Sequence, residues 1–239
     1  MILKLVVFDM AGTTVFDGDA VCNCLRESLR QVAGCEVSRQ AVNQVMGIPK
    51  PLAISQLLAP GDRTDQAGPH VVSAVFRDFQ ARMLRHYNDG PDVREIDGAA
   101  DVFRRLKKAG LAVALDTGFN RTIADAVMRR LGWNASGLID AVATSDDVAA
   151  GRPAPDMIYC LMKRTGVENA AEVAKVGDTP ADLLEGTNAG CGLVVGVTSG
   201  SHTAPELEKF PHTHLIESIR ELPDLIVKSE RAATPLSGG

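Results

Sequence analysis

Short apolar segments alternate with amphipathic segments over residues 98–197, and this alternation limits the possible folds more than any other feature of the chain. Short apolar segments are typical of strands buried on both faces of a parallel sheet, and apolar residues three or four apart indicate helices. The repetition predicts a doubly wound, Rossmann-like α/β core with helices on both faces of a parallel sheet. The expected strands are 3–8, 111–115, 139–144, 173–176 and 193–197, and the expected helices are 99–109, 121–131, 155–165 and 181–189.

A small helical insertion separates the first expected strand from the rest of this pattern. Residues 18–94 show no strand pattern, and their apolar residues recur at helical spacing. The expected helices of the insertion are 20–32, 38–46, 51–58 and 70–87. The expected units are an α/β core of residues 1–15 and 95–230, an all-helical cap of residues 16–94 and a flexible tail of residues 231–239.

Composition and charge restrict the partners and the compartment. The net charge is −5 without a long run of Lys or Arg, which argues against nucleic acid because phosphate backbones require a basic face. No apolar stretch reaches the roughly 20 residues that span a bilayer, and the first residues lack the pattern of a signal peptide. The five cysteines are scattered, as expected for free thiols in a reducing compartment. We therefore expect a cytoplasmic monomer or homodimer that binds neither nucleic acid nor membranes.

Two aspartates follow expected strands at the edge where open α/β sheets bind their ligands. Asp9 ends the first apolar segment, and Asp178 follows the segment 173–176. Two carboxylates at one edge repel each other unless a cation lies between them, and Mg²⁺ is the usual cation where oxygen ligands and phosphate meet. Asp182 lies one helical turn after Asp178, where it could support the metal site. Each aspartate alone could equally cap a helix, but their order along the chain favours a magnesium site.

Two further signals at this edge suit a bound anion. Thr117 and Gly118 follow an expected strand and offer a hydroxyl group and an accessible backbone N–H group at a helix start. Arg152 lies in a loop framed by Gly and Pro, where its charge would neutralise a nucleophile and a bound phosphoryl group. Taken singly, these residues also suit a turn and a surface arginine.

The residue at position 11 restricts the chemistry. Asp9 could serve as a phosphoryl-accepting nucleophile. Hydrolysis of an ordinary phosphate ester also requires an acid that protonates the leaving oxygen, worth about 10²–10⁴ in rate. An aspartate two residues after Asp9 would supply this acid, but the chain has Ala11 there. Either the chemistry needs no acid at this position, or another group activates the leaving atom.

Four motifs occur in order along the chain: Asp9–Thr14, Thr117-Gly118, Ala150–Pro153 and Gly177–Asp182. Together they resemble the four motifs of the haloacid dehalogenase superfamily, and the resemblance covers nearly the whole chain. The alanine in the first motif and the Gly-Arg-Pro loop are similar to the phosphonoacetaldehyde hydrolase (phosphonatase) branch, which carries a helical cap after the first motif. The resemblance implies a Mg²⁺-dependent hydrolase that forms an aspartyl-phosphate.

The resemblance also explains the missing acid. In phosphonatases a cap lysine condenses with the substrate aldehyde, and the protonated imine accepts the electrons of the broken C–P bond. That lysine follows a Met-Gly pair by three residues, as Lys50 does here. A helix starting at Pro51 would help to lower the pKa of the Lys50 amine, because a helix N-terminus disfavours a nearby cation by about 0.3–1 kcal/mol. The chain departs from the branch at Ala53, where members carry His, and at Phe119, where they carry a hydroxylated aromatic residue.

The resemblance implies a role for each residue of the motifs. The expected catalytic residues are Asp9, Lys50, Thr117 and Arg152; the substrate-binding residues are Gly12, Thr13, Met46, Gly118 and Phe119; the metal ligands are Asp9, the Ala11 carbonyl and Asp178; and the residues that support the metal are Thr179 and Asp182.

The leading hypothesis is therefore cleavage of the C–P bond of a small carbonyl-bearing phosphonate, phosphonoacetaldehyde or a relative. The alternatives are a phosphatase or phosphotransferase acting on an activated phosphate substrate and a non-catalytic phosphate-binding module. A halide-releasing hydrolase would also lack the acid at position 11. It needs no metal, so Asp178 and Asp182 argue against it.

Overall fold

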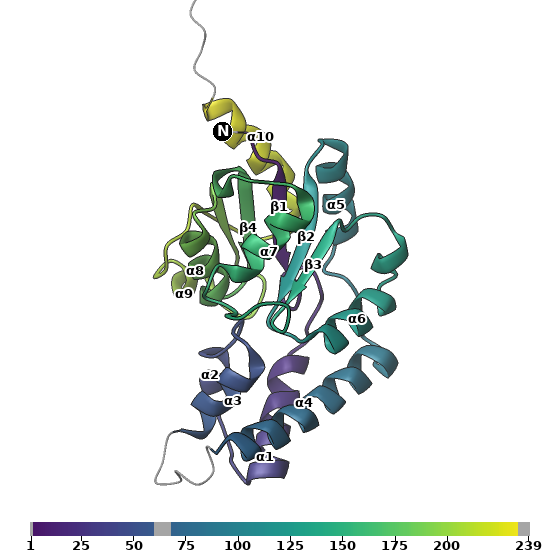
Figure 1. Ribbon diagram of the computed structural model, residues 1–239, viewed down its shortest axis with the longest axis vertical. Coiled ribbons are helices and arrows are strands. Elements are labelled where there is room, and N and C mark those ends of the chain that lie inside the picture. Colours follow the sequence, from purple (N-terminus) through teal and green to yellow (C-terminus); the bar gives the residue numbers. More distant parts are fainter. Residues whose placement is uncertain (1, 60–67, 234–239) are drawn as a thin grey trace, which may run out of the picture.

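The computed structural model describes residues 2–59 and 68–233. Six parallel strands form one sheet in the order β3-β2-β1-β4-β5-β6 (Figure 1). This order is that of a doubly wound α/β fold, so the predicted fold class is confirmed. The strands are β1 (Leu5–Asp9), β2 (Ala112–Thr117), β3 (Ala141–Thr144), β4 (Val173–Gly177), β5 (Leu193–Val197) and β6 (His214–Ile216).

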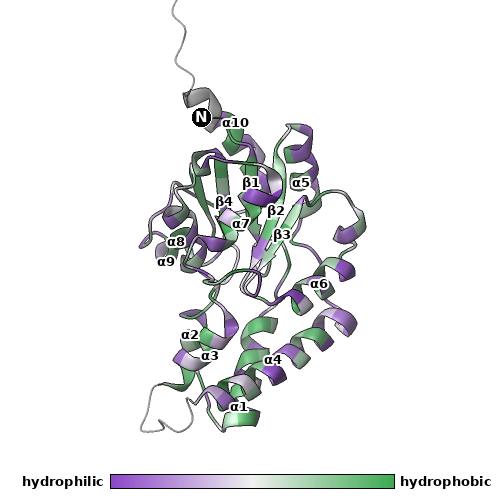
Figure 2. Ribbon diagram, viewed as in Figure 1, coloured by the Kyte–Doolittle hydropathy of each residue, from purple (hydrophilic) through white to green (hydrophobic). Residues whose placement is uncertain are grey.

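Helices cover both faces of the sheet, and this explains why the strands are apolar on both sides. Leu5 and Val7 of β1 belong to the core layer that contains α7, whereas Val6 and Phe8 belong to the opposite layer, which contains α5. In Figure 2 the central strands are accordingly coloured as hydrophobic. The helices of this part are α5 (Ala99–Lys108), α6 (Arg121–Arg130), α7 (Asp156–Thr165), α8 (Pro180–Ala189), α9 (Ala204–Leu207) and α10 (Leu222–Ala233), with short 3-10 helices at Trp133–Ala135, Ala170–Glu172 and Ile219–Glu221.

Four further helices form a group at one end of the sheet (Figure 1). They are α1 (Ala20–Ala33), α2 (Arg39–Asn43), α3 (Lys50–Leu58) and α4 (Pro69–Asp89). Apolar side chains of α1 and α4, such as Leu25 and Phe79, are buried between these helices, as the predicted helical periodicity requires. The long helix α4 also packs against α6 and so ties the group to the α/β part.

The chain leaves and re-enters the α/β part along two adjacent segments. Val15 forms an isolated antiparallel bridge with Glu95, and the Phe16 N–H group donates a hydrogen bond to the Arg94 carbonyl at 3.0 Å. The Arg94 guanidinium lies 3.8 Å from the centre of the Phe16 ring, a favourable cation–π contact. These contacts hold the outgoing and returning segments together where the chain passes between the α/β part and the helical group.

Some expected boundaries differ from the structure. Helix α3 begins at Lys50, one residue before the expected Pro51. The edge strand β6 was not among the expected strands because it is only three residues long. Residues 231–233, expected in a flexible tail, are helical because they continue α10, whose Leu222 and Ile226 are buried against the α/β part. The remaining residues of the expected tail, 234–239, lie outside the described part of the chain.

Of the described helices, none has the length and apolar character needed to cross a membrane.

Candidate active site

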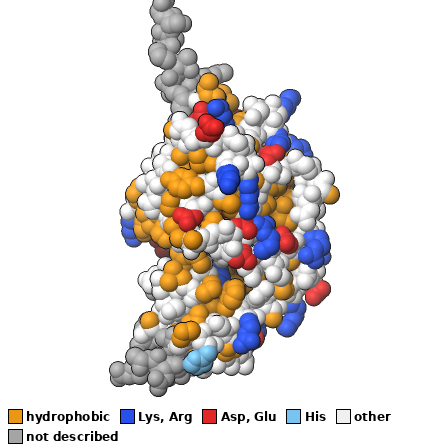
Figure 3. Space-filling model, viewed as in Figure 1, with side chains coloured by type: hydrophobic (Ala, Val, Ile, Leu, Met, Phe, Trp, Pro, Cys, Tyr) orange, Lys and Arg blue, Asp and Glu red, His pale blue; other side chains and the backbone are white. Residues whose placement is uncertain are grey.

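A cleft lies between the carboxyl ends of the strands and the helices α2 and α3. It has a volume of about 270 Å³, which suits a small molecule, and it opens beside β1 and β4, where the order of the strands reverses. The wall combines residues of the β1–α1 segment, of α2 and α3, and of the loops that follow β2, β4 and β5. Acidic and basic side chains are interspersed on the outer face shown in Figure 3.

Arg152 links the cleft to a buried group of carboxylates. Its side chain is fully buried, and its Nη1 atom donates a hydrogen bond to Asp9 Oδ1 at 2.6 Å. The same guanidinium binds Asp182 at 2.9 Å and Glu185 at 3.0 Å and also contacts Asp116. A planar guanidinium can serve several carboxylates at once, which a lysine ammonium cannot do with the same geometry. Arg152, the cation predicted in the Gly-Pro loop, is therefore a buried residue that links four carboxylates of the site, and not a surface arginine.

A second buried cation, Lys175, lies behind Arg152. Its Nζ atom lies 3.1 Å from both Asp182 and Glu185 and donates a hydrogen bond to Asp116. The sequence analysis missed Asp116, Lys175 and Glu185. The signal that could have found two of them is a charged residue within an apolar strand, since Lys175 lies in the middle of β4 and Asp116 in β2.

Asp178 is held by hydrogen bonds from two segments. Thr13 Oγ1 donates to its Oδ1 at 3.1 Å, and Ser201 donates to its Oδ2 from the backbone N–H at 2.7 Å and from Oγ at 2.6 Å. Gly12, with a φ of 92°, passes so close that a Cβ atom there would lie 2.4 Å from Asp178 Oδ2. Only glycine therefore fits both this backbone conformation and this contact. Ser201, which the sequence analysis missed, fixes the orientation of the carboxylate.

The charges of this site are unbalanced. Five carboxyl groups are buried here, those of Asp9, Asp116, Asp178, Asp182 and Glu185. Among the described residues, two buried cations, Arg152 and Lys175, pair with four of them, and Asp178 has no such ion pair. Burial raises the pKa of Asp9 to about 8, with Arg152 opposing the shift and the Asp182 and Asp178 charges adding to it. Burial and the Asp182 charge also raise the pKa of Asp178. A divalent cation would relieve this repulsion.

The acidic residues fit a metal ion with oxygen ligands. Carboxylate oxygens of Asp9, Asp178 and Asp182 all lie within 4.8 Å of one another. Asp182 is already engaged, because its Oδ2 accepts a hydrogen bond from Thr179 Oγ1 at 2.6 Å and its Oδ1 contacts Arg152. Asp9 and Asp178 both line the cleft, where their oxygens could bind a metal in the orientations that Arg152, Thr13 and Ser201 give them, while Asp182 and Thr179 brace the loop. The Ala11 residue lines the same cleft.

Lys50, the first residue of α3, faces the cleft from the helical side. Only 4% of the residue is exposed, and within the described residues its ammonium group has no ion pair or hydrogen bond. The Nζ atom lies 5.7 Å from the centre of the Phe119 ring. Burial lowers the pKa of Lys50 to about 8, with Asp9 opposing the shift and Arg152 adding to it. The main cause is therefore burial, whereas the sequence analysis relied on the start of the helix.

The structure brings most of the predicted residues to one cleft. Its wall contains eleven of the thirteen predicted residues: Asp9, Ala11, Gly12, Met46, Lys50, Thr117, Gly118, Phe119, Arg152, Asp178 and Thr179. The other two, Thr13 and Asp182, lie directly behind it and hold Asp178 and Arg152. The Thr117 hydroxyl accepts a hydrogen bond from the Phe119 N–H group at 3.1 Å, so its own proton remains available for an anion.

Residues of the linker between β1 and α1, of α1 and of α2 also line the cleft, and the sequence did not predict them. They are Phe16, Asp17, Gly18, Asp19, Val21, Arg39 and Asn43, together with Gly47, Ile96 and Ser199–Ser201. The sequence carries little signal for those before Ile96, because the packing of the helical group on the α/β part decides which of its side chains face the site. Ser199–Ser201 follow β5, so their place after a strand is the signal that could have found them.

Comparison with known proteins identifies the family of the chain. The model of the haloacid dehalogenase-like hydrolases matches residues 3–190. The chain belongs to this family of hydrolases. A phosphonoacetaldehyde hydrolase of Bacillus cereus (strain AH187) is 31% identical over 218 residues, which cover 84% of this chain and 78% of the relative. A protein of Dickeya dadantii (strain 3937) named "Probable phosphatase IndB" is 29% identical, with 91% of each chain covered.

Solved structures share the fold. A phosphonoacetaldehyde hydrolase-like protein from Oleispira antarctica superposes with a TM-score of 0.84 at 21% identity, covering 96% of this chain and 93% of the other. The chain is thus an enzyme with the α/β fold of its family, and its acidic cluster suits the Mg²⁺ that such hydrolases generally use.

Proposed function

We propose that the protein is a Mg²⁺-dependent hydrolase that cleaves the C–P bond of a small carbonyl-bearing phosphonate, phosphonoacetaldehyde or a close relative. The observation that carries this proposal is the placement of Lys50. A buried lysine that forms no ion pair with the described residues faces the same cleft as the Asp9 carboxylate, in a site that has Ala11 where a phosphatase needs an acid. The relative from Bacillus cereus supports the same substrate class.

The chemistry assigns Asp9 and Lys50 to opposite ends of the substrate. The Asp9 carboxylate attacks phosphorus, while Lys50 has condensed with the carbonyl carbon to form an iminium group. The electron pair of the breaking C–P bond moves to the carbon and is delocalised into the iminium, so no acid is required at position 11. Water then hydrolyses the aspartyl-phosphate, which regenerates Asp9 and releases phosphate and a proton. The enamine left on Lys50 takes up a proton at carbon, and a second water molecule hydrolyses the resulting iminium to the aldehyde and the free Lys50 amine.

The remaining cleft residues hold the phosphoryl group and the nucleophile. In this proposal Thr117 and the Gly118 N–H group, which line the cleft, bind phosphonate oxygens, and Arg152 orients Asp9 through its 2.6 Å hydrogen bond. Mg²⁺ held by Asp9, the Ala11 carbonyl and Asp178 would neutralise charge on the phosphonate oxygens. The helices of residues 16–94 act in this proposal as a cap over a core of residues 1–15 and 95–230.

Phosphate release from a panel of substrates tests the proposal. The purified protein is supplied with phosphonoacetaldehyde, a phosphonate without a carbonyl group, a simple alkyl phosphate and an acyl phosphate, each with and without Mg²⁺. We expect Mg²⁺-dependent release from phosphonoacetaldehyde far above the other substrates, with acetaldehyde formed in equal amount. Faster turnover of the alkyl phosphate than of any phosphonate would overturn the proposal.

A phosphatase acting on an activated phosphate is the second candidate. Ala53 and Phe119 leave Lys50 without the side-chain partners seen in the phosphonatase branch, and both residues are buried in the structure. A relative named as a phosphatase matches 91% of the chain. An acyl phosphate has a good leaving group and needs no acid at position 11, so preference for this member of the panel would favour the second candidate.

A further inference from the structure

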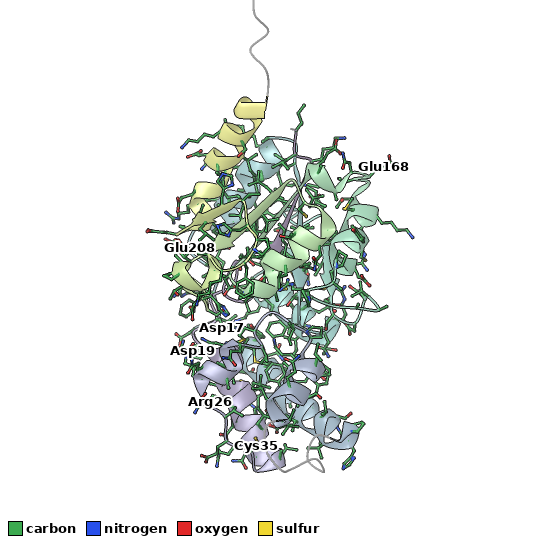
Figure 4. All side chains as sticks on the ribbon, turned by 90° about the vertical axis from the view of Figure 1, so that its left-hand side faces the viewer. Asp17, Asp19, Arg26, Cys35, Glu168 and Glu208 are labelled. Atoms are coloured by element: carbon green, nitrogen blue, oxygen red, sulfur yellow. The ribbon has the colours of Figure 1, made fainter. Side chains whose placement is uncertain are left out.

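Asp17 adds a carboxyl group to the cleft on its helical side, apart from the Asp9 carboxylate at the end of β1. It lies in the linker between β1 and α1 and lines the same cleft as Asp9 and Lys50. In Figure 4 it is seen where the helical group meets the α/β part. Neither the proposed metal site nor the proposed contacts to the phosphonate involve Asp17.

The contacts of Asp17 leave one oxygen free to act in the cleft. Its Oδ1 accepts a hydrogen bond from the Val21 N–H group at 3.2 Å, which caps the start of α1. Across the described ranges 2–59 and 68–233, Oδ2 has no hydrogen bond and no ion pair. Asp19, two residues on, also lines the cleft, but it is bound to Arg39 at 2.5 Å, and both side chains are more than half exposed. Asp17 is therefore the carboxyl group of the helical side that remains available to a substrate.

Several charged and titratable groups face Asp17 from the surrounding elements. They are Asp19 in the same linker, Lys50 at the start of α3, Asp178 after β4 and the Tyr87 hydroxyl group on α4. Burial raises the pKa of Asp17 to about 6, with the Val21 hydrogen bond opposing the shift and Asp178 adding to it. A carboxyl group of this kind holds and releases a proton near neutral pH, which is the property required of a general acid and base.

We propose that Asp17 is the catalytic residue that transfers protons during the condensation of Lys50 with the substrate carbonyl. The proposal rests on the proposed function, because it requires an imine at Lys50. Ala53 and Phe119, which replace the His and the hydroxylated aromatic residue of the phosphonatase branch, cannot transfer protons. Asp17, with its free oxygen, supplies this ability from the segment between β1 and α1.

The proton balance of the step assigns two tasks to Asp17. The neutral Lys50 amine adds to the carbonyl carbon, and the carbonyl π electrons move to oxygen. Asp17 then donates its proton to this oxygen and takes a proton from the added nitrogen, which leaves a neutral carbinolamine. In the second task the Asp17 carboxylic acid protonates the hydroxyl group, which departs as water while the nitrogen lone pair forms the iminium. Asp17 ends as a carboxylate beside this cation and regains its proton when hydrolysis releases Lys50.

The variants Asp17→Asn and Asp19→Asn form a matched pair for the test. Asparagine keeps an oxygen that accepts from the Val21 N–H group, so α1 remains capped, but it cannot exchange a proton. Both residues line the cleft and each variant replaces one carboxyl group by an amide, so the pair separates proton transfer by Asp17 from the general loss of a carboxyl group in the cleft. Urea unfolding and calorimetric Mg²⁺ binding establish that each variant is folded and retains its metal site.

The first measurement is the rate at which Lys50 forms an imine, and it does not depend on C–P cleavage. Each protein is mixed with phosphonoacetaldehyde, or with acetaldehyde as a probe without phosphorus, in the presence of cyanoborohydride. Mass spectrometry then follows the reduced adduct on Lys50. We expect Asp17→Asn to slow adduct formation about 10²-fold or more, and Asp19→Asn to have an effect at least about tenfold smaller. Equal rates in the two variants, or an adduct that never forms on the parent, would overturn the role of Asp17.

The second measurement is phosphate release from phosphonoacetaldehyde, which tests the proposed function separately. If the parent forms the adduct but releases no phosphate, C–P hydrolysis is contradicted. The adduct rates of the two variants still decide whether Asp17 transfers protons. Phosphate release that is lost in Asp17→Asn together with the adduct supports both proposals. Phosphate release that is unchanged in Asp17→Asn contradicts the role of Asp17 alone.

Discussion

Arg152 donates a hydrogen bond to Asp9 at 2.6 Å across 143 positions of the sequence, and neither side chain is open to bulk solvent. The guanidinium holds the nucleophile in one orientation and offsets part of the desolvation that raises the pKa of Asp9. Because Arg152 also binds Asp116, Asp182 and Glu185, the orientation of the nucleophile depends on the whole buried network.

Replacing Arg152 by Lys separates charge from geometry. Lys keeps the charge, but its ammonium group cannot reach all four carboxylates, so we expect kcat to fall by about 10²-fold or more while the protein still folds. Arg152→Ala removes the cation from buried carboxylates and is expected to lower the free energy of unfolding by about 3–5 kcal/mol. Steady-state kinetics and urea unfolding measure the two effects. Near-parental kcat in Arg152→Lys would contradict the orienting role.

Asp9→Asn and Asp178→Ala test the nucleophile and the metal site. An amide is no nucleophile toward phosphorus, so Asp9→Asn should abolish turnover while the chain remains folded. Asp178→Ala removes an expected metal ligand and should weaken Mg²⁺ binding in calorimetry at least about tenfold. Turnover by Asp9→Asn in the presence of Mg²⁺, at a rate near the parental one, would show that another residue attacks phosphorus.

Much of this site could be predicted from the sequence because its residues follow strands of a parallel sheet. Asp9, Thr117 and Asp178 end or follow the strands β1, β2 and β4, and the topology of a doubly wound sheet brings such positions together. Lys50 was found through its motif. Asp17 could not be found in this way, because its exposure to the cleft depends on how the helical group packs on the sheet. Tertiary packing of this kind leaves no periodic signal.

Ala11→Asp restores the acid that is missing from the first motif. Ala11 lines the cleft, so the new carboxyl group would lie near the leaving atom. We expect turnover of the phosphonate to stay the same or fall, since its leaving carbon is stabilised through Lys50. Hydrolysis of a simple alkyl phosphate should rise, by at most about 10²-fold. A clear gain in phosphonate cleavage would mean that the parent reaction does require an acid at this position.

The pH dependence should report Lys50. Its pKa is lowered from 10.5 to about 8, and only the neutral amine adds to a carbonyl, whereas Asp17, with a pKa of about 6, must be protonated to donate its proton. The kcat/KM for the phosphonate should therefore rise with pH up to about pH 6, stay level to about pH 8 and fall above it. Asp9 must also be deprotonated, so saturating Mg²⁺ is used to keep it ionised. Hydrolysis of an acyl phosphate, which uses Asp9 but not Lys50, provides the control and should lack this rise. The same rise with both substrates would assign it to Asp9.

Lys50→Arg separates a covalent role from an electrostatic one. Arg keeps the positive charge but cannot form the imine, so C–P cleavage should be lost while Mg²⁺ binding and folding remain. Borohydride added during turnover should inactivate the parent and leave a substrate adduct on Lys50 in the mass spectrum. Substantial activity of Lys50→Arg without any adduct on the parent would reduce Lys50 to a cation that binds the phosphonate.

Lys50 should also lower the stability of the fold. Because its pKa is lower in the folded chain than in the unfolded chain, protonation favours unfolding. The penalty is complete below the folded pKa of about 8 and disappears above the unfolded value of 10.5. Lys50→Met, which keeps the apolar stem, should raise the free energy of unfolding by about 1–3 kcal/mol near pH 7 and by less near pH 10.

The exposed Lys163 provides the control for Lys50→Met, since Lys163→Met should change the free energy of unfolding by less than about 0.5 kcal/mol. Urea unfolding at both pH values measures the difference. A loss of stability in Lys50→Met at neutral pH would contradict the view that this lysine is retained for chemistry at the expense of the fold.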